Sequence, residues 1–137
     1  MLTKVIKFKD ANGVEREEKF YFNLTKAELT KMEMSEKGGL AAHLERAIAA
    51  QDGTIIMNAI ENIIDKSYGE KSADGREFLK EDRDGYPLYK RFKQTEAYSI
   101  LFMELVTDAD MAAKFVNGIV PSDIQPQLKS AEHPALK

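Results

Sequence analysis

Apolar and polar residues alternate in two segments at the start of the chain and predict a β-hairpin over residues 2–22. Asn12-Gly13 lies between these segments, and this dipeptide favours the two positive φ angles of a tight turn. An isolated two-stranded ribbon is marginal in water, so we expect the apolar face of the hairpin to pack against helices. The apolar side chains of that face are Leu2, Ile6, Phe8, Phe20 and Phe22.

From residue 24 onward, apolar residues recur at intervals of three and four, which predicts helices. Thr25-Lys26-Ala27-Glu28 is a capping box, in which the threonine and glutamate side chains bond to free amides at the start of a helix. The predicted helices span residues 25–36, 40–51, 54–66, 95–106 and 108–118.

Residues 69–86 combine glycines with charged residues, so we expect a long loop there, with one short strand at 77–80. After Pro121 the chain has two more prolines and few apolar residues, which predicts a flexible tail over 122–137. The pattern therefore indicates a mainly α protein. One small helical bundle spans residues 1–121, with the N-terminal hairpin packed on it and the disordered tail behind it.

The helix at residues 95–106 is apolar around most of its circumference, and Glu96, Ser99 and Glu104 form a narrow polar strip. Such a helix must be covered nearly all round, so we interpret it as the central helix of the bundle. The alternative is an exposed patch for a partner, and a bundle can bury one face while it offers another. From this apolar excess we predict partner-binding residues, with Phe115 and the hairpin face in support. They are Tyr98, Leu101, Phe102, Leu105 and Phe115.

Composition narrows the possible functions. The chain has 137 residues, enough for one domain that needs no metal or disulfide to fold, and it has no cysteine for thiolate chemistry. A net charge of -3 gives no driving force for binding nucleic acid. Lysines interrupt the apolar residues at the start, and no apolar stretch approaches the roughly 20 residues of a membrane span. We therefore expect no signal peptide, no membrane contact and a cytoplasmic protein.

Candidate catalytic chemistry is sparse. His43 and His133 are the two histidines, and neither has the neighbours of a catalytic triad or a metal site. Residues 82–85 match part of a calcium loop, but Lys80 and Arg91 fall where the loop needs carboxylates. We therefore expect no enzymatic activity, no cofactor and no metal.

Five strings between about residue 20 and residue 121 carry information through their combination and order. They are FYFNLT at 20–25, IIDKSYG at 63–69, SADGREF at 72–78, QTEAYSILFMEL at 94–105 and FVNGIVP at 115–121. With these strings the chain resembles the tail assembly chaperones of long-tailed, siphovirus-type bacteriophages and prophages. None of the strings is a catalytic signature.

The resemblance implies a non-enzymatic protein of the host cell cytoplasm that takes part in viral tail morphogenesis. Such a chaperone coats the tape measure protein, helps to recruit the tail tube protein, self-associates, and is absent from the mature virion. One alternative is a structural tail-completion or connector protein that stays in the virion. Another is a small-molecule-binding or enzymatic domain, which would need polar groups that converge in a pocket.

Overall fold

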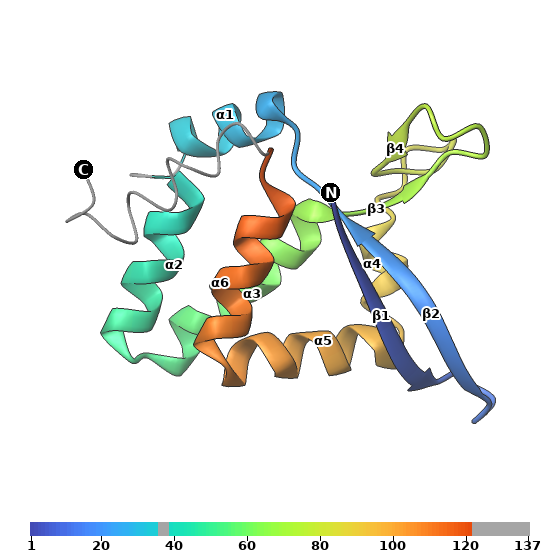
Figure 1. Cartoon of the computed structure of the whole chain (residues 1–137), viewed down its shortest axis with the longest axis horizontal. Helices are drawn as coiled ribbons and strands as arrows, with labels where there is room; N and C mark the ends of the chain where they lie inside the picture. Colours follow the sequence, from blue (N-terminus) through green and yellow to red (C-terminus); the bar gives the residue numbers. More distant parts are fainter. Residues whose placement is uncertain (36–38, 122–137) are drawn as a thin grey trace.

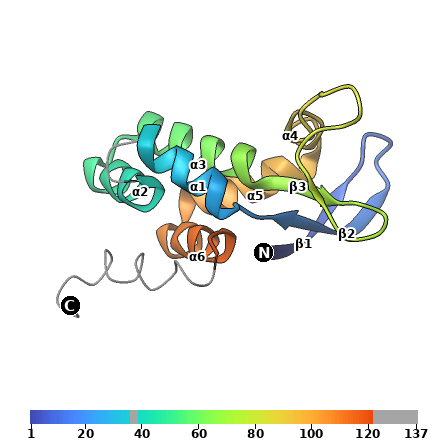
Figure 2. The same ribbon diagram turned by 90° about the horizontal axis from the view of Figure 1, so that it is seen from above.

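The computed structural model describes residues 1–35 and 39–121, which form a four-stranded antiparallel sheet and six helices (Figure 1). The strand order is β1-β2-β3-β4, so each strand pairs with the next along the chain. Figure 2 shows the sheet at one end of the molecule and α1, α2 and α6 toward the other. In chain order the elements are β1 (Leu2–Lys9), β2 (Glu15–Phe22), α1 (Lys26–Ser35), α2 (Gly39–Ala50), α3 (Gly53–Ser67), β3 (Tyr68–Lys71), β4 (Phe78–Leu79), α4 (Tyr89–Phe92), α5 (Glu96–Thr107) and α6 (Ala109–Ile119).

The predicted mainly α bundle is wrong, because the hairpin is half of a larger sheet and the fold is α+β. β3 lies in the segment where we expected a loop, and it pairs with the end of β2 through Tyr21↔Gly69 and Phe22↔Tyr68. β4, in the place of the expected short strand, pairs with β3. The sheet therefore continues past the hairpin, and the helices pack around it as a second component. The tail predicted over 122–137 lies outside the described residues.

The predicted hairpin is confirmed, but its turn differs from the expected one. β1 and β2 pair from Leu2↔Phe22 to Lys9↔Glu15. Only Gly13 among the turn residues has a positive φ, of 79°. The Gly13 amide donates to the Asp10 carbonyl at 2.9 Å, and the Asp10 amide donates to the Val14 carbonyl at 2.9 Å. This is a three-residue loop that ends in a glycine bulge.

The core lies where the chain leaves β2 and passes between α3 and α6. The Asn23 amide donates to the Ser67 carbonyl, and the Leu24 amide donates to the Ile119 carbonyl, each at 2.8 Å. These two bonds tie the exit of the sheet to the C-terminal ends of two helices. Leu24 is then followed by the predicted capping box, in which the Glu28 amide donates to Thr25 Oγ1 and the Thr25 amide donates to Glu28 Oε1.

Aromatic side chains connect the sheet to the helices at this point. The ring of Phe22, which is fully buried, meets the rings of Tyr68, Phe92 and Phe115 with centroids 5.8, 5.8 and 5.1 Å away. Tyr68 and Phe92 stack on each other with centroids 4.4 Å apart. One cluster thus joins β2, β3, α4 and α6. No helix of the described residues has both the length and the apolar character needed to cross a membrane.

Candidate partner-binding surface

Helix α5 runs along one side of the molecule and is not covered all round (Figure 1). Ala97, Leu101 and Leu105 form its buried row, at a spacing of four residues. On the other side of the helix, Ile100 is 38% exposed and Met103 is 54% exposed. The interpretation of this helix as the covered centre of a bundle is therefore wrong, because the sheet and the other helices pack against only one side of it.

The structure separates the five predicted partner-binding residues into two groups. Leu101, Leu105 and Phe115 are buried in the core, where they hold α5 and α6 in place. Tyr98 and Phe102 are half-buried, and their rings stack with centroids 5.8 Å apart. The role of all five in binding stays a prediction. A partner of the folded chain would touch Tyr98 and Phe102 directly and the other three only indirectly.

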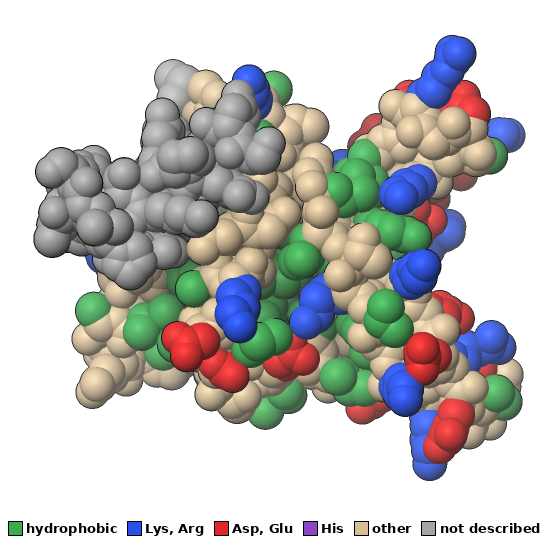
Figure 3. Space-filling view, in the orientation of Figure 1, with side chains coloured by type: hydrophobic (Ala, Val, Ile, Leu, Met, Phe, Trp, Pro, Cys, Tyr) green, Lys and Arg blue, Asp and Glu red, His purple; other side chains and the backbone are tan. Residues whose placement is uncertain are grey.

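Two further apolar side chains of α5, Met103 and the half-buried Val106, lie beside Tyr98 and Phe102 around the helix. We call Tyr98, Phe102, Met103 and Val106 the α5 surface. The sequence interpretation placed Met103 and Val106 on this helix but did not select them. Their helical position opposite the buried row is the signal that identifies them. Figure 3 shows hydrophobic side chains between acidic ones along the lower margin of the molecule, where α5 runs.

A charged group lies at the N-terminal end of the α5 surface. Lys93 Nζ is 3.1 Å from Glu61 Oε2 and 3.1 Å from Asp65 Oδ2, both on α3. Burial raises the pKa of the Asp65 carboxyl, and the hydrogen bond from Lys93 opposes only part of that rise. The Tyr98 hydroxyl is buried and has no hydrogen-bond partner among the described residues. Burial, with the nearby Asp65 carboxylate, raises the pKa of Tyr98 to about 12.

We expect Tyr98→Phe to change how stability depends on alkaline pH. The folded chain holds the Tyr98 proton more tightly than the unfolded chain, whose tyrosine has a pKa near 10.0. The stability from this group is therefore complete below pH 10.0 and is lost as pH rises toward 12. Urea unfolding at several pH values should show a shallower decline for the variant.

At neutral pH the same substitution removes a buried hydroxyl without a partner, so stability should change by less than about 1 kcal/mol. Tyr86→Phe is the matched control, because Tyr86 is 41% exposed, and it should leave the decline unchanged. An equal decline in wild type and Tyr98→Phe would contradict this account.

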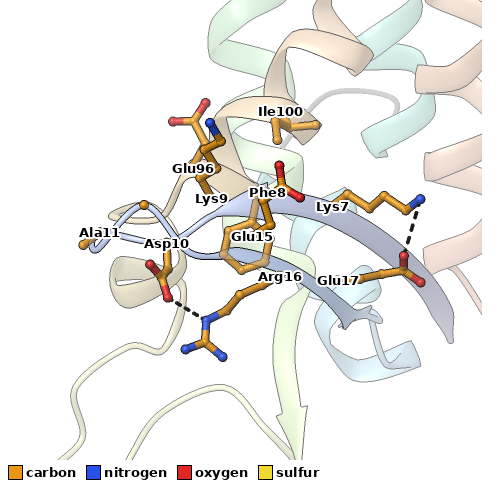
Figure 4. Close-up of a pocket in the computed structure, with 11 residues that line it drawn as sticks. Lys7, Phe8, Lys9, Asp10, Ala11, Glu15, Arg16, Glu17, Glu96 and Ile100 are labelled. Carbon is orange, nitrogen blue, oxygen red and sulfur yellow. Dashed lines mark hydrogen bonds and ion pairs between the residues drawn. The ribbon is translucent and has the colours of Figure 1, made fainter.

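The described residues contain no cluster of three or more histidine, aspartate or glutamate side chains arranged to hold a metal ion. An open groove of about 940 Å³ lies beside the hairpin and is lined largely by charged residues, together with Phe8 and Ile100 (Figure 4). A second hollow, of about 480 Å³, lies between α1, α3 and α4. There Lys80 Nζ is already bonded to Glu28 Oε2 at 2.9 Å and to the Lys66 carbonyl. In the first groove, Lys7 pairs with Glu17 and Arg16 pairs with Asp10. The charged side chains named here in both hollows thus already bond to other parts of the protein.

Comparison with known proteins gives one match. A family model described as phage tail assembly chaperone matches residues 1–137. No curated protein and no solved structure matches the chain. The family match covers the hairpin, the rest of the sheet and the α5 surface.

Proposed function

Because the chain belongs to the phage tail assembly chaperone family, we propose that it binds the tape measure protein and helps to recruit the tail tube protein during tail morphogenesis. Family membership over residues 1–137 is the observation that carries this proposal. The family implies a non-enzymatic role, so the chain acts through its surfaces. We further propose that it works in the host cell cytoplasm, self-associates, and leaves before the virion is complete.

The α5 surface is the contact that we propose for the tape measure protein. A helical partner with an apolar face would cover side chains such as Met103, which is 54% exposed. Full burial of one large apolar side chain contributes about 1.5–3 kcal/mol. The four side chains of the α5 surface are already partly covered, and association itself costs at least about 4 kcal/mol. Each contact is therefore weak, which suits a protein that coats a long partner in many copies and must be released.

We expect Met103→Asp to lower binding to the tape measure protein of the same phage by at least about tenfold, because a charge in an apolar contact loses its hydration. Co-expression followed by affinity capture measures this. Met103 is more than half exposed, so the variant should keep the unfolding midpoint of the wild type. Met57→Asp is the matched control, since Met57 is a methionine on α3 with 43% exposure.

Phe102→Asp tests the same surface at a half-buried position. If Met103→Asp and Phe102→Asp both fold and both bind like the wild type, the α5 surface is not the contact, although the family assignment stands. Mass spectrometry of purified virions tests the other part of the proposal. An assembly factor is absent from them, whereas a tail-completion or connector protein would be found in a fixed number of copies.

A further inference from the structure

Strand β1 forms a free edge of the sheet. It is the first strand in the order β1-β2-β3-β4 and pairs with β2 along its whole length. The Asp10 amide bonds to the Val14 carbonyl, and bonded residues alternate along an antiparallel pair. The even-numbered residues of β1 therefore bond to β2, and the odd-numbered residues direct their backbone groups away from it. The outward residues are Thr3, Val5, Lys7 and Lys9.

These outward backbone groups have no hydrogen-bond partner among residues 1–35 and 39–121. The side chains of the same four residues are exposed, on the face of the sheet that α5 does not cover. Val5, a β-branched apolar residue, is 55% exposed in the middle of the strand. A row of unpaired amides and carbonyls along a strand of eight residues is a template for another strand.

There is room for another strand beside the half of β1 that leads into the turn. The open groove of about 940 Å³ is lined there by Lys7, Phe8 and Lys9 of β1 and by Glu96 and Ile100 of α5. The turn and residues 15–17 of β2 complete its lining. Figure 4 shows Ile100 beyond β1, on the side away from Arg16 and Glu17 of β2. Ile100 is 38% exposed and Phe8 is half-buried, so together they offer apolar contact to the inner side chains of an added strand.

The charged side chains along β1 favour an added strand that carries carboxylates. Lys7 and Lys9 are exposed on the outer face, where they lie opposite Glu17 and Glu15 of β2. The ion pair of Lys7 with Glu17, at 3.6 Å, is too exposed to neutralise Lys7 strongly, so both lysines can also attract carboxylates on their other side. Carboxylates opposite these two lysines, and an apolar residue opposite Val5, would make favourable cross-strand pairs. The β1 strand of a second copy would add two more lysines and no carboxylate to the same face, so it would offer Lys7 and Lys9 no opposite charge. Lysines on an edge deter pairing of that kind.

We propose that β1 binds an extended, acidic segment of a partner protein, which adds to the sheet as a new strand next to β1. The backbone groups of the four outward residues provide the hydrogen bonds. Lys7 and Lys9 select acidic residues in the segment, and Val5 with Ile100 selects apolar ones. This edge is separate from the α5 surface, and the proposal does not depend on that surface.

The test uses the full chain and two synthetic peptides that differ only in the residues opposite Lys7 and Lys9, which are glutamate in one and lysine in the other. Both peptides have valine opposite Val5 and at the positions that face the groove. Amide hydrogen exchange followed by NMR measures directly whether the outward amides of β1 become hydrogen-bonded. The glutamate peptide should slow exchange at Val5, Lys7 and Lys9, and the lysine peptide should not. The proposal is overturned if both peptides act equally or if neither protects these amides. Protection without peptide that grows with protein concentration would assign the edge to a second copy and also overturn it.

Val5→Pro tests the hydrogen bonds of the β1 edge without disturbing the pairing of β1 with β2. Proline removes the outward amide of Val5 but no bond to β2, so the chain should fold while affinity for the glutamate peptide falls by at least about tenfold. Glu17→Pro is the matched control, because the Glu17 amide points away from β1 at the other edge of the hairpin. Glu17→Pro also removes the ion-pair partner of Lys7, so it should not lower the affinity for the glutamate peptide. A loss of affinity in Glu17→Pro but not in Val5→Pro would refute the site. If Val5→Pro unfolds, a variant with Lys7→Glu and Lys9→Glu should prefer the lysine peptide, and an unchanged preference would refute the site.

Discussion

Replacing Phe22 by alanine is expected to lower the free energy of unfolding by about 3–5 kcal/mol. Phe22 is 0% exposed, and its ring meets three other aromatic rings that come from β3, α4 and α6. Alanine leaves a cavity at the point where the sheet joins the helices, and the backbone bonds just after Phe22 limit how far the site can collapse. Urea unfolding followed by circular dichroism measures the loss.

A loss of this size is a large part of the about 5–15 kcal/mol that stabilises a typical domain, so the variant should also yield little folded protein. Tyr86→Ala removes another aromatic side chain, but one that is 41% exposed, and it should change stability by less than about 0.5 kcal/mol. If the two variants lost similar amounts of stability, the aromatic cluster would not be the centre of the core.

The second large effect is expected from Gly69→Ala. A Cβ at this position would lie 2.6 Å from Phe78 Cε2 and 2.7 Å from the Leu79 carbonyl oxygen. The phenylalanine ring can move, but the carbonyl belongs to the backbone of β4, so β3 and β4 must separate. We expect a loss of about 1–3 kcal/mol, together with faster amide exchange in β4.

Gly53→Ala is the control for Gly69→Ala. Gly53 begins α3, and a Cβ there would meet nothing within 4 Å. Alanine at such a position reduces the freedom of the unfolded chain, so stability should be unchanged or higher by up to about 1 kcal/mol. Equal losses from the two glycine variants would show that close packing of β3 on β4 is not what requires glycine at position 69.

Much of the local structure could be predicted from the sequence, because its signals are local. The alternation in residues 2–22, the capping box at Thr25 and the helical periods of α3 and α6 each depend on neighbouring residues. β3 could not be predicted in this way. It has four residues, too few for a clear period of two, and Gly69 belonged to the glycine-containing segment that predicted a loop. Its strand conformation depends on pairing with residues 21 and 22, far away in the chain.

The candidate surface shows a similar limit. Apolar residues on almost every side of α5 give the helix no preferred direction, so the sequence alone could not separate buried Leu101 and Leu105 from exposed Met103. The direction is set by tertiary contacts. One of them is the ion pair between Lys4 Nζ of β1 and Glu104 Oε1 of α5, at 2.7 Å, which places one flank of the helix against the hairpin. The α5 surface consists of the side chains of this helix that the tertiary contacts do not fully cover.

The hydrogen bond from the Leu24 amide to the Ile119 carbonyl has a consequence for folding during translation. Leu24 leaves the ribosome 95 residues before Ile119, so the hairpin and the first helices must wait for α6 before the core can close. Until then Phe22 and its neighbours are open to proteases and to other nascent polypeptides. We therefore expect fragments that end before α6 to be degraded or to aggregate. A chaperone of this family must first complete its own fold, and here it can do so only after α6 has left the ribosome.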